Sequence, residues 1–314
     1  MKPKVEFRKV RDFGEIISDC ILFIRQEWKG LLKTYFTFCG LFIAGNMLFS
    51  LLFRLKLIHL HNANLSGNSF STGSVFGLEY FMVLIFGFLN IISATLTVLC
   101  YITLYNEKGR QTPGINEIWA YYKYYFWRIV GHTLLLTIII FLGLFAIVLP
   151  LAYALRGAEA FFLGIIILVC VMAPLIYFAT VFSLFFPIVV TENAGFGYAL
   201  SKCFTLIKRK WWNTFGVLLV VGLIVYAGFL VIIIPFSIIS GGGITFLSYN
   251  VSFPIVIVYT ILFSLCQVYN ILPLCASSIA YFSYSEDKES TGLLERIDTL
   301  GKPDETFEPG NETY

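Results

Sequence analysis

Apolar residues along the chain fall into six long runs that are separated by short polar segments. The runs lie near residues 31–53, 76–104, 129–153, 160–190, 214–239 and 252–282. Each reaches the roughly 20 apolar residues that an α-helix needs to cross the hydrocarbon core of a bilayer. The fourth and sixth runs are longer than a perpendicular crossing requires, which predicts tilt or protrusion past the bilayer. The pattern predicts an all-α, polytopic membrane helix bundle with six transmembrane helices.

A helical period precedes the first and fifth runs. In "FGEIISDCILFIRQEW" (13–28), apolar side chains recur every three to four positions and fill one stripe of a helix, with Asp19, Arg25 and Glu27 on the opposite face. "FGYALSKCFTLIKRKW" (196–211) has the same stripe and matches the first segment without a gap at its Phe, Gly, Ser, Cys and Trp. A third candidate, "INEIWAYYKYYFWRIVGH" (115–132), has a similar stripe in an ambiguous register. The stripes predict amphipathic helices near 12–28, 115–128 and 196–211 that lie along the membrane interface, on its cytoplasmic side.

These segments suggest three consecutive units, each an interfacial helix followed by two spans. The even-numbered spans end alike, in "YNEKG", "VTENAG" and "YSEDKES", with Glu107, Glu192 and Glu286 at comparable ends. The common order predicts a parallel internal repeat rather than an inverted one. Chance similarity between apolar segments is the alternative, above all for the middle unit. We expect the membrane domain to cover 1–287 and residues 288–314 to form a short cytoplasmic helix and a disordered acidic tail.

Composition and charge indicate where the protein is located and how it is oriented. Of the 314 residues 58% are hydrophobic and 13% charged, which excludes a soluble domain because so few charges cannot cover its surface. Cations gather before the first span and in the loops around 105–128 and 192–212, whereas the alternate loops carry only Arg54, Lys56 and Arg156. The positive-inside rule therefore predicts cytoplasmic N and C termini. The basic start leads into an amphipathic helix instead of a short apolar core with a cleavage site, so no signal peptide is expected.

The cations beside the spans predict a lipid partner. Anionic headgroups are their nearest counter-charge, so we expect membrane lipids, and room for membrane-protein partners, rather than nucleic acid. The hypothesised headgroup contacts are Arg25, Lys29, Lys123, Arg128, Lys202, Lys208, Arg209 and Lys210. Tryptophan suits the interface because its ring is apolar and its N–H needs a polar partner, which makes Trp28, Trp127, Trp211 and Trp212 the expected anchors.

Few residues offer catalytic or metal-binding chemistry. His59 and His61 are expected in an outside loop without a nearby Cys, Asp or Glu, and His132 at the start of the third span. The seven cysteines lie in spans or on the amphipathic helices, and their spacing suggests neither a disulfide framework nor a metal site. No nucleophile elbow, phosphate loop or zinc-peptidase motif is present. We therefore expect no enzymatic activity and no cofactor.

Polar residues at membrane depth are the remaining candidates for a site. They are Asn46, Glu79, Asn90, Gln267 and Asn270, of which Asn90, Gln267 and Asn270 lie deepest and form a candidate intramembrane site. Interhelical hydrogen bonds, worth roughly 0.6–2 kcal/mol each, would account for them without any cargo. A polar path for a solute is the alternative. Prolines are expected to kink or end the later spans, at Pro150, Pro174, Pro187, Pro235, Pro254 and Pro273.

Two stretches resemble known membrane proteins. "VVTENAGFGYALSKCFTLIKRKWWNTFGVLLV" (189–220) resembles the membrane domain attached to some glycerophosphodiester phosphodiesterases, with an acidic turn, an Ala-Leu-Ser helix and a Trp-led span. "YFSYSEDKESTGLLERIDTLGK" (281–302) is similar to the closing segment of uncharacterised six-span proteins of Bacteroidetes-type bacteria. The resemblance implies a bacterial cytoplasmic membrane. It carries over no catalytic residue, since no soluble phosphodiesterase domain is expected here.

The sequence favours a non-enzymatic membrane protein that acts as a lipid-facing scaffold or partner subunit. The alternative is a transporter or permease for a small or lipidic solute, which predicts a polar cavity at Asn90, Gln267 and Asn270. A weaker reading is a lipid-modifying enzyme, which would need titratable residues gathered on one side of the membrane. Glu107, Glu192 and Glu286 are the candidates for that role, unless they cap the turns that lead into the interfacial helices.

Overall fold

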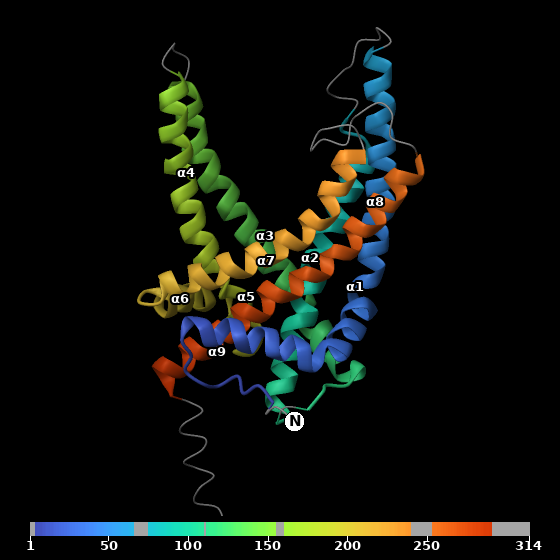
Figure 1. Ribbon diagram of the computed structural model, residues 1–314. Helices are drawn as coiled ribbons and strands as arrows, with labels where there is room; N and C mark the ends of the chain where they lie inside the picture. Colours follow the sequence, from blue (N-terminus) through green and yellow to red (C-terminus); the bar gives the residue numbers. More distant parts are fainter. Residues whose placement is uncertain (1–3, 66–74, 110, 155–159, 240–252, 291–314) are drawn as a thin grey trace, which may run out of the picture.

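The computed structural model describes residues 4–65, 75–109, 111–154, 160–239 and 253–290, which are helical apart from short connections (Figure 1). The elements are α1 (Phe13–Leu65), α2 (Leu78–Glu107), α3 (Ile115–Ala154), α4 (Ala160–Phe182), α5 (Phe185–Thr191), α6 (Phe196–Ile207), α7 (Trp211–Ile239), α8 (Phe253–Leu265), the 3₁₀ helix η2 (Cys266–Asn270) and α9 (Ile271–Glu289). Within this part of the chain, six helical segments are long and apolar enough to span a membrane. The predicted all-α, six-span class is confirmed.

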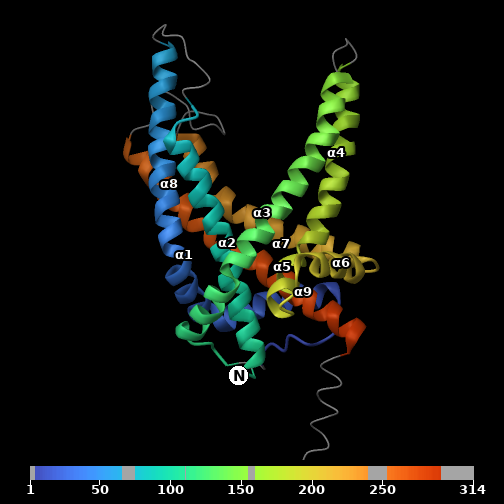
Figure 2. The same ribbon diagram turned by 180° about the vertical axis from the view of Figure 1, so that it is seen from behind.

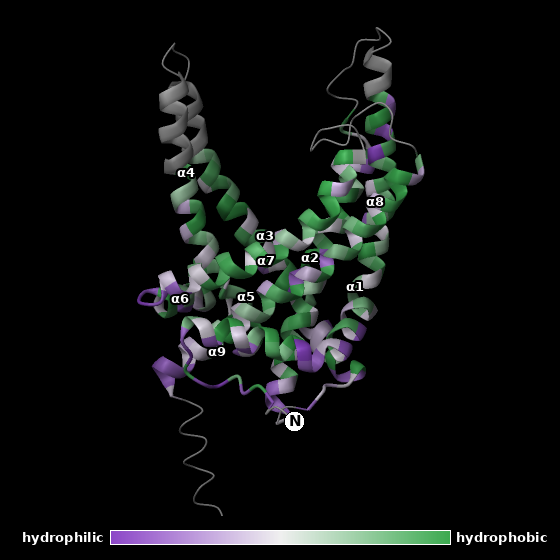
Figure 3. Ribbon diagram, viewed as in Figure 1, coloured by the Kyte–Doolittle hydropathy of each residue, from purple (hydrophilic) through white to green (hydrophobic). Residues whose placement is uncertain are grey.

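The helices form a V in both views (Figures 1 and 2). One arm consists of α3 and α4, the other contains α1, α2 and α8, and α7 runs obliquely from α6 toward the second arm. The arms meet at the end where the N-terminus lies, which we call the closed end. Hydrophilic residues gather mainly there, while apolar residues cover the arms (Figure 3). This division matches a bilayer around the arms and water at the closed end.

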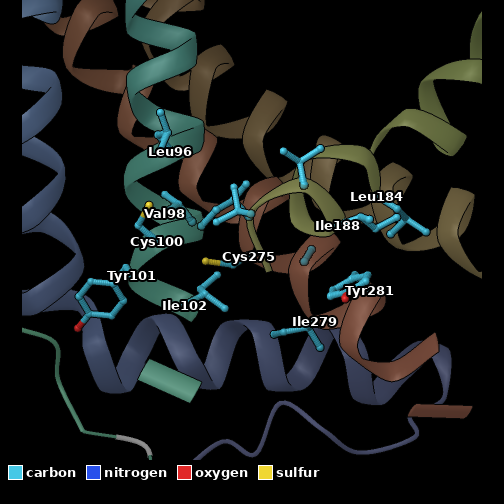
Figure 4. Close-up of a cluster of buried hydrophobic side chains, with 14 of the residues drawn as sticks. Leu96, Val98, Cys100, Tyr101, Ile102, Leu184, Ile188, Cys275, Ile279 and Tyr281 are labelled. Atoms are coloured by element: carbon cyan, nitrogen blue, oxygen red, sulfur yellow. The ribbon is translucent and has the colours of Figure 1, made fainter. Parts of the chain in front are cut away.

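The main core lies at the closed end, where the last turns of α2 meet α5 and α9 (Figure 4). Every residue of α2 from Ile92 to Tyr105 is buried, so this stretch is enclosed on all sides. Leu96 and Ile102 of α2, Ile188 of α5 and Ile279 of α9 belong to one cluster, with the first part of α1 running beneath it. Burial on all sides, rather than on one stripe, marks α2 as the central helix.

Helix α1 joins two elements that the sequence predicts separately. Its first part lies across the closed end and the rest rises along the arm, within one 53-residue helix (Figure 1). The helix also continues to Leu65, so the predicted outside loop with His59 and His61 is wrong. Residues 54–65, "RLKLIHLHNANL", contain no Gly or Pro and are rich in Leu, which favours continued helix.

The fourth and sixth predicted spans are both broken near a proline. Helix α4 ends at Phe182 before α5 begins, and η2 interrupts the path from α8 to α9. Pro187 is the third residue of α5 and Pro273 the third residue of α9. A proline lacks an N–H and clashes with the carbonyl four residues earlier, but it is tolerated in the first turn of a helix. The expected breaks at these two prolines are confirmed, whereas Pro174 and Pro235 lie inside α4 and α7.

The segments 13–28, 115–128 and 196–211, here called the collar segments, share one burial register. Counted from Phe13, Ile115 and Phe196, the third, seventh and tenth following residues are buried in each. They are Ile16, Cys20 and Phe23, then Ile118, Tyr122 and Tyr125, then Ala199, Cys203 and Leu206. In each segment the main-chain N–H of the first of these residues donates to the carbonyl oxygen of the residue before the helix. That residue is Asp12, Gly114 or Gly195. The register that sequence left open for the middle segment therefore aligns Ile115 with Phe13 and Phe196.

The second span of each unit is followed within two residues by a left-handed residue. Gly109, Asn193 and Ser290, which follow α2, α5 and α9, have φ values of 62°, 50° and 48°. A left-handed residue at this position lets following N–H groups reach the last carbonyls of a helix, as in the 3.2 Å bond from Ala194 N to Val189 O. The shared register and the shared ends support the predicted parallel repeat of three units.

The N-terminal segment, which the sequence suggests only as a basic tail, packs into the closed end. Phe7 is buried, and its ring centroid lies 5.1 Å from that of Phe23 and 5.4 Å from that of Phe282. Arg11 is also buried and donates from Nε to Asp19 at 2.7 Å and from its guanidinium to the Phe7 carbonyl at 2.8 Å. The sequence signal was the alternation of apolar and charged residues in "KVEFR". Of the segment 288–314, which the sequence predicts to hold a short helix, residues 288 and 289 end α9, Ser290 is its C-cap, and the rest lies outside the described residues.

Candidate functional site

Asn90 of α2 and Gln267 of η2, two residues of the predicted intramembrane site, are hydrogen-bonded to each other. Nδ2 of Asn90 donates to Oε1 of Gln267, and Nε2 of Gln267 donates to Oδ1 of Asn46 at 3.5 Å. Nδ2 of Asn46 in turn donates to the Val83 carbonyl at 3.2 Å. Asn46, Asn90 and Gln267, here called the polar cluster, thus connect α1, α2 and the break between α8 and α9.

The break in the last span explains why polar groups gather at this place. A 3₁₀ segment followed by a proline leaves helix carbonyls without their usual partners. Tyr35 of α1, which is fully buried, donates its hydroxyl to the main-chain oxygen of Gln267 at 3.1 Å. Asn270, the third predicted residue, is half-buried and makes no hydrogen bond through its side chain within the described part of the chain. The structure therefore joins Asn90 and Gln267, adds Asn46, and leaves Asn270 outside.

One atom of the polar cluster has an unmet hydrogen bond. Asn90 is 4% exposed, and its Oδ1 finds no donor among the described residues. One helical turn further along α2, Ser93 accepts from the Tyr122 hydroxyl at 3.0 Å and donates to the Phe38 carbonyl at 3.1 Å. The hydroxyl groups next to the cluster thus form hydrogen bonds that link α1, α2 and α3. An unpaired buried acceptor costs about 1–3 kcal/mol, so Oδ1 of Asn90 is where a further donor would bind.

A second polar group, here called the ionic cluster, lies at the closed end. Nζ of Lys202 in α6 lies 2.7 Å from Oε1 of Glu192 and 2.6 Å from Oε1 of Glu289. The Tyr281 hydroxyl also donates to Oε1 of Glu192, and Ser285 donates to Oε2 of Glu289 at 3.0 Å. Only 11% of the Lys202 side chain is exposed. The ionic cluster therefore ties α6 to the ends of α5 and α9.

The charge on Lys202 is secured by its two carboxylate partners. Burial by itself would lower the pKa of Lys202, but the hydrogen bonds and charges of Glu192 and Glu289 outweigh it and raise the pKa above its ordinary value of 10.5. Because the pKa is raised in the folded protein, the lysine's contribution to stability is fully present below pH 10.5 and is lost only as the pH rises through the folded value.

The predicted headgroup contacts divide into two groups. Arg25, Lys29, Lys123, Lys208 and Arg209 are exposed, and none forms an ion pair within the described residues. The other three are engaged by the protein. Arg128 donates to the Asn193 carbonyl at 3.0 Å, Lys202 belongs to the ionic cluster, and Lys210 pairs with Asp287 at 3.2 Å. Sequence position alone could not separate the two groups.

The four predicted tryptophan anchors divide in a similar way. Trp28, Trp127 and Trp212 are exposed. Trp211 is half-buried, and its ring stacks on Phe215 at 5.3 Å and lies 6.0 Å from Tyr177. Trp211 therefore packs α7 against α4, while the other three present their rings to the surroundings.

The acidic residues of the closed end are paired with hydroxyl groups and cations. Glu107 accepts from the Tyr121 hydroxyl at 2.8 Å, which joins the end of α2 to α3. Glu27, expected on the polar face of its helix, is 8% exposed and accepts from Tyr101 at 2.8 Å and Thr112 at 3.0 Å. The polar-face prediction for Glu27 is wrong, because its helix is covered on that side by α2 and the 111–114 segment.

Other reactive residues are built into the core. The six cysteines with described side chains are free and buried, and burial raises the pKa of the Cys203 thiol to about 12. His132 packs between Phe185 and Phe196, with ring centroids 5.8 Å and 5.6 Å away. Within the described part of the chain, no three His, Cys, Asp or Glu side chains gather in a way that would hold a metal ion.

No family model, no curated protein and no solved structure matches this chain. The resemblance to the membrane domain of glycerophosphodiester phosphodiesterases therefore stays a prediction.

Proposed function

We propose that this chain is a non-enzymatic integral membrane protein that acts as a lipid-facing scaffold or as the partner subunit of a membrane assembly. The polar cluster carries the proposal. Asn90 and Gln267 use their side chains on each other and on Asn46, across three elements of the bundle. Polar groups paired between helices hold a bundle in one arrangement. A path for solutes needs such groups to face water instead.

The proposed location is the cytoplasmic membrane of a bacterium, with the closed end in the cytoplasm. The exposed cations lie in the collar segments or, for Lys29, directly after one, and cytoplasmic loops carry such an excess; they are Arg25, Lys29, Lys123, Lys208 and Arg209. Trp28, Trp127 and Trp212 are exposed on or next to the same segments and suit the headgroup level. The collar segments would then lie on anionic headgroups. Exposed apolar side chains on α7, such as Leu223, Val231 and Ile238, would face acyl chains.

A Gln267→Leu substitution tests the role of the polar cluster. It removes the link between Asn90 and Asn46, and we expect a loss of roughly 0.6–2 kcal/mol of stability, the usual worth of an interhelical hydrogen bond. The measurement is the thermal unfolding midpoint of the purified protein in detergent. Asn270→Leu is the matched control, because it lies in the same 3₁₀ helix without such a bond. Equal effects of both changes would contradict a cluster that joins the helices.

A transporter or permease for a small or lipidic solute is the second candidate. Two observations favour it, namely the discontinuous span α8–η2–α9 and the unpaired Oδ1 of Asn90 that adjoins the break. Interrupted helices form solute sites near the bilayer midplane in many transporters. The test treats an Asn90→Cys variant and the unchanged protein with a water-soluble thiol reagent. Mass spectrometry then gives the number of adducts on each. One additional adduct would favour transport, and none would favour the scaffold.

A further inference from the structure

A cavity of about 440 Å³ opens at the closed end between the α6–α7 connection and the last turns of α9. Its charged lining consists of Lys208, Arg209 and Lys210 from the connection and Asp287 and Lys288 from α9. Thr205 and Tyr284 complete the polar wall. The volume falls within the range of ~300–1,000 Å³ that is typical of small-molecule sites. We call this space the basic cavity.

The basic cavity has more positive than negative charge. Four cations line it against one carboxylate, that of Asp287, which pairs with Lys210 at 3.2 Å. Lys288 donates to the Thr205 carbonyl at 2.9 Å, an acceptor that does not cancel its charge. Lys208 and Arg209 are exposed and form no ion pair within the described residues. Three of the four cations are therefore available to an anion.

The surroundings of the basic cavity favour a phosphate group that is carried by a lipid. Trp211 and Trp212 follow Lys210 directly and begin the apolar helix α7, and Trp212 is exposed. A ligand in the cavity thus lies next to a surface suited to the membrane interface. Basic pockets between membrane helices on the cytoplasmic side bind phosphorylated headgroups. The planar guanidinium of Arg209 also matches two phosphate oxygens at once.

We propose that the basic cavity binds the phosphate ester of an anionic lipid headgroup. The site rests on the proposed lipid-facing role and adds a specific contact to it. A general attraction of the collar segments would act through every exposed cation on them. The basic cavity would instead concentrate binding on Lys208, Arg209 and Lys288, since these line one open cavity.

The first experiment measures binding of fluorescent phosphatidylglycerol to the full chain in nanodiscs of phosphatidylcholine. The double variant Lys208→Gln/Arg209→Gln removes two cations of the cavity, and we expect the Kd to rise about thirty-fold, or about five-fold for each cation. The matched control is Arg25→Gln/Lys29→Gln, which removes the same charge at the end of the first collar segment and directly after it. We expect this control to change the Kd less than about two-fold.

A second pair of variants tests the shape of the cavity without changing its charge. Thr205→Trp would fill the space with a bulky ring and should weaken binding as strongly as the charge variant. Ser201→Trp is its control, because Ser201 is exposed one turn earlier on α6 and does not line the cavity. The thermal unfolding midpoint of each variant identifies any that fails to fold, and the remaining pair still gives an answer.

Competition identifies the source of the phosphate. Displacement of the labelled lipid by inorganic phosphate would assign the cavity to free phosphate as well as to lipid. Displacement by unlabelled phosphatidylglycerol alone would assign it to the headgroup. Equal weakening by the two double variants, or unchanged binding in the cavity variants, would overturn the site. Because lipid binding is measured at the basic cavity, this result is independent of the Gln267→Leu unfolding test and the Asn90→Cys labelling test, which address the polar cluster.

Discussion

Gly30→Ala is expected to destabilise the protein by about 2.5–6 kcal/mol, the largest effect that we predict for a single substitution. A Cβ at position 30 would overlap the Tyr101 hydroxyl and would lie 3.1 Å from Cγ2 of Thr112. Tyr101 is fully buried, so its ring has no space into which it could withdraw. Moving it would also break its 2.8 Å hydrogen bond to Glu27, a buried carboxyl group. The total adds about 1–3 kcal/mol of overpacking to about 1.5–3 kcal/mol for a bond to a charged group.

Gly14→Ala is the matched control for Gly30→Ala. Gly14 lies in the same helix, and a Cβ there would have no atom within 4 Å. Alanine favours a helix over glycine, so we expect unchanged stability or a gain of up to about 1 kcal/mol. The thermal unfolding midpoint in detergent compares the two variants. Adding Tyr101→Phe to Gly30→Ala should restore part of the loss by removing the clashing oxygen. Similar unfolding midpoints for the two alanine variants would show that the close approach of α1 and α2 at Gly30 does not contribute to stability.

Lys202→Met is expected to cost about 3 kcal/mol. The change leaves Glu192 and Glu289 next to each other without their shared cation. Removing one partner of a buried ion pair usually costs about 3–5 kcal/mol, and the lower end applies because the Glu289 side chain is 39% exposed. Since these carboxylates lie at the ends of α5 and α9, the loss should loosen the contact of α6 with both.

Two comparisons isolate the charge effect of Lys202→Met in thermal unfolding. Lys208→Met removes an exposed lysine from the end of the same collar segment and should change stability by less than about 0.5 kcal/mol. Adding Glu192→Gln and Glu289→Gln to Lys202→Met removes the uncompensated charges and should recover at least half of the loss. A triple variant no more stable than Lys202→Met would mean that packing of the lysine stem, rather than its charge, stabilises α6.

Part of the candidate site follows from the sequence. Asn90 and Gln267 are identifiable because a polar amide inside an apolar run is costly unless it finds a partner. Their pairing with each other is not identifiable, since they lie 177 positions apart in the chain. Asn270 fits the sequence criterion equally well, but in the structure its side chain makes no hydrogen bond to the described residues. Residue type thus identifies the candidate polar residues. The packing of α2 against η2 determines which two of them form a hydrogen bond.

The collar segments show the same division. Their apolar stripes predict one covered face in each segment, and Cys20 and Cys203 are buried there, although Ile21, Trp28 and Trp119 of the same stripes are exposed. The middle segment shares the burial register although its residues there are Ile118, Tyr122 and Tyr125, so sequence identity could not align it. The position of a residue in the helical register determines whether it is buried, and several residue types occur at the buried positions.

The sequence by itself determined the six spans, the three collar segments and the side of the molecule on which cations gather. These properties depend on local hydrophobicity, period and charge, which are readable along the chain. Only the tertiary structure decided that Lys202 is enclosed by two carboxylates, that Glu27 is buried, and that Lys208 and Arg209 stay free to line a cavity. Those outcomes depend on which distant segment covers each side chain, and the energy of a charge is set by its neighbours in space.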